Sequence, residues 1–100
     1  MEKDIEKYLR LEIKKIGGLA LKFVSPGFTG IPDRIILLPF GFIVFVEAKD
    51  IGKKLRRRQE YVKKQFEDLG FKVYKIDNKQ QVKELCSIYQ KHIKSTEQGK

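Results

Sequence analysis

Two strongly apolar segments joined by a short turn constrain the fold of this chain more than any other feature. Residues 35–38 and 42–46 are aliphatic or aromatic throughout, and Pro39, Phe40 and Gly41 separate them. A three-residue connection with a glycine at its end is typical of a β-hairpin, because glycine readily adopts the left-handed conformation that such a turn needs. Continuous apolar strands of this kind are expected where both faces of a sheet are covered.

The length of the turn predicts which residues of the hairpin face one another. If Leu38 pairs with Phe42, the numbers of paired residues sum to 80 and Asp33 falls opposite Glu47. Directly opposed residues have Cβ atoms about 5 Å apart, so two carboxylates would lie side by side. Lys49 is two residues beyond Glu47 and therefore shares its face. A slip of one residue would move Asp33 to the other face.

The rest of the chain alternates between helical and strand patterns. Apolar residues recur at helical spacing over residues 4–16, 55–69 and 79–92, which predicts three helices. Residues 19–24 and 71–76 read as strands, and a right-handed crossover would place the last strand beside the second hairpin strand. The sequence therefore predicts an α/β fold, in which a mixed sheet is flanked by helices.

The size of the chain suits one compact unit. One hundred residues, of which 41% are hydrophobic, suffice for a single core. We expect one domain over residues 1–93 and a polar, disordered C-terminal tail over residues 94–100.

Polar residues interrupt two of the predicted apolar helix faces. In the first helix, Glu6 lies at the edge of the apolar stripe and Glu12 lies within it. An acid on a core-facing side is unusual without a partner or a metal. In the second helix, Gln59 lies inside the stripe and needs hydrogen-bond partners, and the nearest strand carries Glu47 and Lys49.

Charge and composition restrict the partners and the metal chemistry. Lys and Arg number 22 against 13 acids, a formal net charge of +9 that favours nucleic acid as the partner. The single Cys86 and the single His92 exclude an internal disulfide and zinc sites rich in cysteine or histidine. Any metal must then be bound by carboxylates, which favours Mg²⁺ or Mn²⁺. No signal peptide or membrane span is visible, so we expect an intracellular location without membrane contact.

The combined pattern resembles the PD-(D/E)xK nuclease superfamily, and more closely its virus-type replication-repair nuclease domain, VRR-NUC. The resemblance covers about residues 2–77 and rests on Pro32-Asp33, Glu47-Ala48-Lys49 and the downstream Gln59. It implies a restriction-endonuclease-like αβββαβ core that cleaves DNA with a divalent metal. Stand-alone members resemble homodimeric endonucleases similar to Holliday junction resolvases, so a dimer, a branched or flapped DNA substrate and a viral or mobile-element origin are expected.

The resemblance also implies roles for individual residues. Spacing does not decide between Glu6 and Glu12 as the acid from the first helix, and the resemblance favours Glu6. The implied metal ligands are Asp33, Glu47, Glu6 and the Ala48 carbonyl, and the implied catalytic residues are Asp33, Glu47, Lys49 and Gln59.

Several further residues are expected to contact DNA. A cluster of basic residues follows the second hairpin strand, and the loop over residues 25–30 can bring backbone N–H groups close to a phosphate. The expected DNA contacts are Lys22, Ser25, Lys53, Lys54, Arg56, Arg57 and Arg58.

Two other functions remain open from the sequence. A non-catalytic nucleic-acid-binding module would need the basic face but not Asp33, Glu47 and Lys49. An anion-binding subunit of a larger enzyme would be active only with its partner. Metal-dependent cleavage of DNA distinguishes the endonuclease from both.

Overall fold

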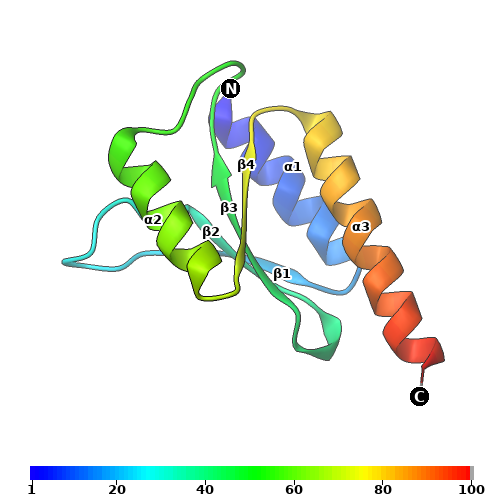
Figure 1. Ribbon diagram of the computed structural model, residues 1–100. Helices are drawn as coiled ribbons and strands as arrows, with labels where there is room; N and C mark the ends of the chain where they lie inside the picture. Colours follow the sequence, from blue (N-terminus) through cyan, green and yellow to red (C-terminus); the bar gives the residue numbers. More distant parts are fainter. Residues whose placement is uncertain (100) are drawn as a thin grey trace.

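The computed structural model describes residues 1–99 and contains a four-stranded mixed sheet flanked by helices (Figure 1). The elements are helix α1 (Glu2–Lys15), strands β1 (Leu19–Lys22) and β2 (Arg34–Leu37), the 3₁₀ turn η1 (Pro39–Gly41), strand β3 (Ile43–Ala48), helix α2 (Arg57–Asp68), strand β4 (Lys72–Ile76) and helix α3 (Lys79–Gln98). The strands lie in the order β1-β2-β3-β4, with β1, β2 and β3 antiparallel and β4 parallel to β3. This order confirms the predicted α/β fold and the crossover through α2.

The hairpin has the predicted register. Arg34 pairs with Val46, and Leu37 pairs with Ile43 at the other end of the ladder. The Leu38 N–H donates to the Phe42 carbonyl over 2.9 Å, so the paired numbers sum to 80 as expected. Gly41 has a φ of 78°, the left-handed conformation that the turn requires.

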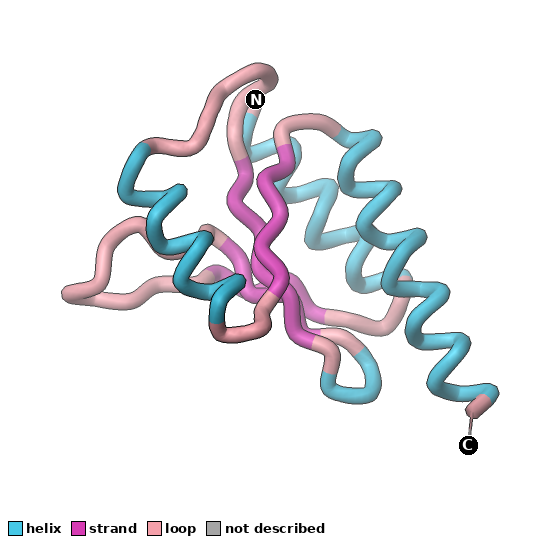
Figure 2. Tube along the Cα trace, in the orientation of Figure 1, coloured by secondary structure: helices cyan, strands magenta, loops and turns pink. Residues whose placement is uncertain are grey.

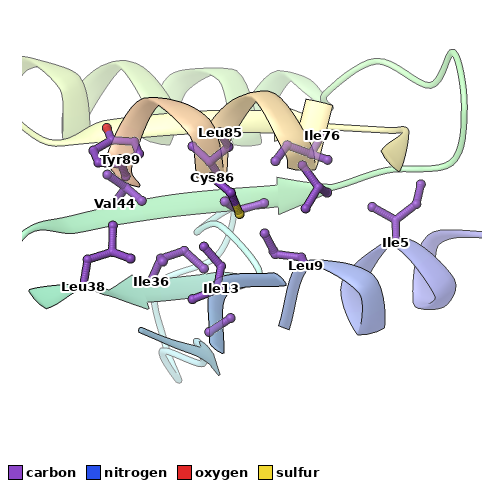
Figure 3. Packing of buried hydrophobic residues seen from close by; sticks show 13 residues of the cluster. Ile5, Leu9, Ile13, Ile36, Leu38, Val44, Ile76, Leu85, Cys86 and Tyr89 are labelled. Carbon is purple, nitrogen blue, oxygen red and sulfur yellow. The ribbon is translucent and has the colours of Figure 1, made fainter. Parts of the chain in front are cut away.

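Helices α1 and α3 pack together against one face of the sheet and bury the main core (Figure 2). Each helix contributes an apolar stripe at helical spacing, and the strands contribute every second residue. Figure 3 shows this packing from close by, with residues such as Leu9, Ile36 and Val44 pointing into a common interior. The core therefore fixes the sheet firmly from this side.

The opposite face of the sheet is only partly covered, by α2. The ring of Phe45 lies 4.9 Å from that of Phe66 and 5.5 Å from that of Phe23, measured between centroids. Beyond this aromatic cluster the face is open, and Leu19 on β1 is 54% exposed. In β1 it is Ala20 that enters the main core, while the larger Leu19 and its neighbours on the same side face away from it.

Helix α3 runs six residues beyond its predicted end at His92. It ends at Gln98, so residues 94–98 are helical and the expectation of a disordered tail is wrong for them. Ile93 is buried, and the Thr96 hydroxyl donates to the His92 carbonyl over 2.9 Å, which extends the packed helix. Lys100 lies outside the described residues. Among the residues that are described, no helix is both long and apolar enough to cross a bilayer.

Gly18 is closely packed in the connection between α1 and β1, and a substitution there tests this packing. A Cβ on Gly18 would lie 2.7 Å from the Leu37 carbonyl oxygen and 2.8 Å from Leu38 Cδ2. We expect Gly18→Ala to lower the free energy of unfolding by about 3 kcal/mol, measured by urea denaturation. Gly41→Ala is the control, because it meets no atom within 4 Å and adds only backbone strain of about 1–2 kcal/mol. A smaller loss for Gly18→Ala than for Gly41→Ala would contradict this packing.

Candidate active site

The two hairpin carboxylates meet at the open end of the hairpin. Arg34 and Val46 are the last pair in the ladder, so Asp33 and Glu47 occupy the next pair of positions. Asp33 Oδ2 accepts a hydrogen bond from the Ala48 N–H over 2.9 Å. Glu47 is only 4% exposed, and it is close enough to Asp33 for that carboxyl to shift its pKa. The turn length thus brings both acids to one corner of the sheet.

Gln59 ties helix α2 to this pair of acids. It is 6% exposed, as expected for a glutamine within an apolar stripe. Its Nε2 donates to Glu47 Oε1 over 3.3 Å, and its Oε1 accepts from the Arg56 N–H over 2.8 Å. The second bond satisfies a backbone donor just before α2, because the first N–H groups of a helix have no partner within it. One side chain therefore positions both Glu47 and the start of α2.

The burial of Glu47 next to a second carboxylate changes its pKa. Burial, and then the hydrogen bond and charge of Asp33, raise the pKa of Glu47 from 4.5 to about 8. Lys49 lies close enough to oppose this shift, but it only partly offsets it. Lys49 alone therefore does not stabilise the doubly ionised carboxylate pair, and a bound cation would do so.

These residues line a pocket of about 340 Å³ at this end of the sheet. The walls are formed by Glu2, Asp33, Glu47, Lys49, Asp50, Lys53, Lys54, Arg56 and Gln59. The structure therefore brings together the Asp33, Glu47, Lys49 and Gln59 set that the sequence analysis had singled out. It also places three of the predicted DNA-binding residues around the same opening.

Neither of the two first-helix acids considered from the sequence lines this pocket. Glu6 forms an ion pair of 3.0 Å with Arg34, and both side chains are largely buried. Glu12 forms an ion pair of 2.6 Å with Lys15. Arg34 follows Asp33 directly and so holds Glu6 beside the site rather than in it.

Glu2 and Asp50 complete the pocket, and both were missed from the sequence. The Glu2 N–H donates to Asp50 Oδ1 over 2.6 Å, which attaches the start of α1 to the segment after β3. Burial, followed by the charge of Asp33, raises the pKa of the Glu2 carboxyl. Glu2 precedes Glu6 by one helical turn, so the same helix side carries both. The sequence feature that could have indicated Glu2 is its position as an acid in the first turn of a helix, where acids are favoured.

The basic residues divide into two groups. Lys53, Lys54 and Arg56 lie in the segment between β3 and α2, whose Gly52 N–H donates to Asp77 Oδ2 over 3.0 Å. This bond fixes the segment against the end of β4 and lowers the pKa of Asp77. The remaining predicted DNA contacts lie outside the pocket walls: Lys22, Ser25, Arg57 and Arg58.

The donor set suits a hard divalent cation. No cluster of three His, Cys, Asp or Glu side chains with metal-site geometry occurs within residues 1–99. Mg²⁺ is commonly held by one or two carboxylates together with water and substrate phosphate oxygens, so Asp33 and Glu47 suffice. Within a strand the N–H and C=O of one residue point to the same side. Because the Ala48 N–H points to Asp33, its carbonyl faces the same corner.

Comparison with known proteins identifies the family. No family model matches the sequence. A solved structure described as a VRR_NUC domain superposes with a TM-score of 0.82 at 32% identity, over 88% of this chain and 96% of that chain. The chain belongs to the VRR-NUC family. This nuclease fold implies use of a divalent metal, in keeping with the two carboxylates.

A curated phage protein matches part of this VRR-NUC chain. The protein described as "Putative nuclease p44", from Acyrthosiphon pisum secondary endosymbiont phage 1, is 58% identical over 53 residues. The match includes 53% of this chain and 57% of the phage protein, so the chain spans just over half of that relative. The recognised family and the fold expected from the sequence are both confirmed.

The pairing of the buried Glu47 carboxylate with Asp33 should destabilise the metal-free protein. Glu47→Gln keeps an oxygen for Gln59 and offers an amide to Asp33, while it removes the like-charge repulsion. At alkaline pH, above the Glu47 pKa of about 8, we expect the free energy of unfolding to rise by about 1–3 kcal/mol in a chelator. Glu60→Gln, on the exposed side of α2, is the control and should change stability by less than about 0.5 kcal/mol. Equal stability of Glu47→Gln and the parent would argue against a costly carboxylate pair.

Proposed function

We propose that this chain is a divalent-metal-dependent endonuclease that hydrolyses DNA phosphodiester bonds, with Mg²⁺ or Mn²⁺ as its metal. The observation that carries the proposal is the pairing of Asp33 with the buried Glu47 in a pocket with Lys49. The reaction adds water across one P–O bond and leaves a phosphomonoester and a hydroxyl. A divalent cation held by the carboxylates supplies positive charge at the phosphate and acidity to the attacking water. We place this reaction inside the cell, in keeping with the phage origin of the relative.

The other side chains around the pocket have distinct roles in the proposed reaction. Lys49 stabilises the negative charge that grows on the phosphoryl oxygens and helps to position the water. The Ala48 N–H fixes the Asp33 carboxylate, and Gln59 fixes Glu47, so both acids are held before the substrate arrives. Gln59 is in this respect a positioning residue. The Ala48 carbonyl, which faces the same corner, is the candidate third metal ligand.

We assign the role of the first-helix acid to Glu2 in place of Glu6. Glu2 lines the pocket and is close enough to Asp33 for their charges to interact. The carboxylate of Glu6 is already engaged by Arg34. Glu2 is thus free to bind water or a metal ion next to the two central carboxylates.

Phosphate contacts are proposed for the basic residues at the pocket opening. Lys53, Lys54 and Arg56 surround it, and Arg57 is exposed at the start of α2. Lys22 and Ser25 lie at the beginning of the loop that leads to Asp33. Cations in these positions would bind the strand on both sides of the cut, with an affinity that falls steeply with salt.

A cleavage panel tests the endonuclease proposal. Four-way junctions, flapped DNA and linear duplex are incubated with Mg²⁺, Mn²⁺ or a chelator, and the products are separated on denaturing gels. We expect metal-dependent cleavage, fastest on branched or flapped DNA, and a rate about 10²–10³-fold lower for Lys49→Ala. Lys72→Ala, an exposed lysine at the start of β4, is the matched control. Glu2→Gln should reduce the rate more than Glu6→Gln if Glu2 is the first-helix acid.

Two other outcomes of this cleavage panel would contradict the endonuclease proposal. DNA binding without cleavage by any metal would favour the non-catalytic binding module. Activity that arises only after a partner protein is added would favour the subunit of a larger enzyme.

We further propose that two copies associate through the open part of the sheet. Leu19 pairs with Leu37, and Leu37 with Ile43, so these three form an apolar row across β1, β2 and β3. Ile43 is 40% exposed, and Phe71 is also exposed at the start of β4. An apolar patch is self-complementary under two-fold symmetry. Two copies that each carry +9 repel one another least when the surface they share bears no charge.

Sedimentation tests this association. The parent is expected at twice its 11.7 kDa mass, while Leu19→Lys and Ile43→Lys should sediment as monomers because each buries a charge in the interface. Leu11→Lys, at an exposed leucine of α1, is the control and should leave the dimer intact. A monomeric parent, or dimerisation that survives both sheet substitutions, would rule out this interface.

A further inference from the structure

An exposed stack of two aromatic rings and an arginine lies where α2 meets the loop between β1 and β2. Phe28 comes from the loop between β1 and β2, and Arg58 and Tyr61 come from the first turns of α2. The Arg58 guanidinium carbon lies 5.2 Å from the centroid of the Phe28 ring and 5.3 Å from that of Tyr61. Phe28 is 41% exposed and Tyr61 is 55% exposed, so both rings keep a large area open to solvent.

Other contacts hold this stack in place. Arg58 Nε donates to the Thr29 carbonyl over 3.2 Å, which ties the loop to α2. Gly30 has a φ of 84°, and a Cβ there would lie 2.6 Å from Arg58 Cγ. The glycine thus allows the loop backbone to press directly against the arginine. The rings are presented by a fixed support.

The stack is connected to the site through the chain on both sides. Arg58 directly precedes Gln59, whose amide donates to Glu47. The loop continues from Gly30 through Pro32 to Asp33. Figures 1 and 2 show this loop beside α2, in agreement with the contacts of Arg58. A strand whose phosphate enters the pocket can therefore reach Phe28 and Tyr61 by continuing along this loop and the start of α2.

We propose that Phe28, Arg58 and Tyr61 form a stacking platform for an unpaired nucleobase next to the phosphate that is cut. Bases stack on aromatic rings and on arginine planes without regard to sequence, because every base has a π face. Within a duplex both faces of each base are already stacked on neighbours. The platform therefore engages DNA where a strand is unpaired, as at a flap or a branch point. This inference rests on the proposed function and supplies a physical source for its preference for branched DNA.

The competing explanation is that the three residues only clamp the loop against α2. A clamp needs the guanidinium and its bond to Thr29, and it gains little from rings exposed at the surface. A platform needs the planar faces of the rings themselves. Substitutions that keep an apolar side chain but remove its π face separate the two explanations.

The test measures DNA affinity without cleavage, in a Lys49→Ala background, for a duplex with a single-stranded arm. Tyr61→Leu and Phe28→Leu remove a π face, and Tyr61→Phe keeps one. We expect each leucine variant to weaken binding of the armed duplex by about 5- to 150-fold, and Tyr61→Phe to bind like the Lys49→Ala parent. Phe40→Leu removes a similarly exposed ring from the turn at the other end of the hairpin and is the matched control.

A base deletion in the DNA completes the test. An abasic residue at the unpaired position should weaken binding to the Lys49→Ala parent by at least the factor found for Tyr61→Leu. Adding Tyr61→Leu to the abasic DNA should cost nothing further, because the base that it contacts is already absent. Additive losses, or equal losses for a blunt duplex without an arm, would overturn the platform. Since no cleavage is measured, a failure of the nuclease proposal would leave this result interpretable.

Discussion

Two carboxylates brought together in a buried corner impose the main physical demand on this fold. When both are ionised, Asp33 and Glu47 repel one another, and the burial of Glu47 adds to the cost of its charge. Each is therefore held by a neighbour: the Ala48 N–H binds Asp33, and the Gln59 amide binds Glu47. Because Gln59 also satisfies the backbone at the start of α2, the same bonds that restrain the acids set the position of a whole helix. A cation bound between the two acids would relieve their repulsion and would in turn attract a substrate phosphate.

The two faces of the sheet divide stability from function. Helices α1 and α3 bury one face in a continuous apolar core, which makes the sheet rigid. The other face carries the pocket at one end, an aromatic cluster around Phe45 in the middle, and an open apolar row at the far end. The aromatic cluster packs α2 against the strands between the pocket and the open row. The pocket and the open apolar row therefore share one face of the sheet, and the other face is left to the core.

The sequence predicted the centre of the site better than its margins. The central residues are positioned by short-range features of the chain, while the others depend on contacts between distant segments. The register of Asp33 and Glu47 follows from a turn of three residues, and the burial of Gln59 follows from helical spacing. Glu2 was missed because α1 begins earlier than predicted, with no side-chain cap to mark its start. The ion pair of Glu6 with Arg34 joins residues far apart in the chain, so spacing within one helix cannot reveal it. The polar end of α3 is not predicted as helix because residues 94–98 carry no apolar side chains and so give no periodic signal.

The hairpin register also has an evolutionary consequence. Many substitutions along β2 and β3 would preserve the alternation that brings Asp33 and Glu47 together, provided that they remain apolar. A single inserted residue between the turn and either acid would point that acid toward the α1 and α3 core instead. Two inserted residues would restore the face but displace the acid by about 7 Å along the strand. We therefore expect the number of residues between these two acids to be more conserved than the identity of those residues. Homologues should show substitutions in this segment but no insertions or deletions.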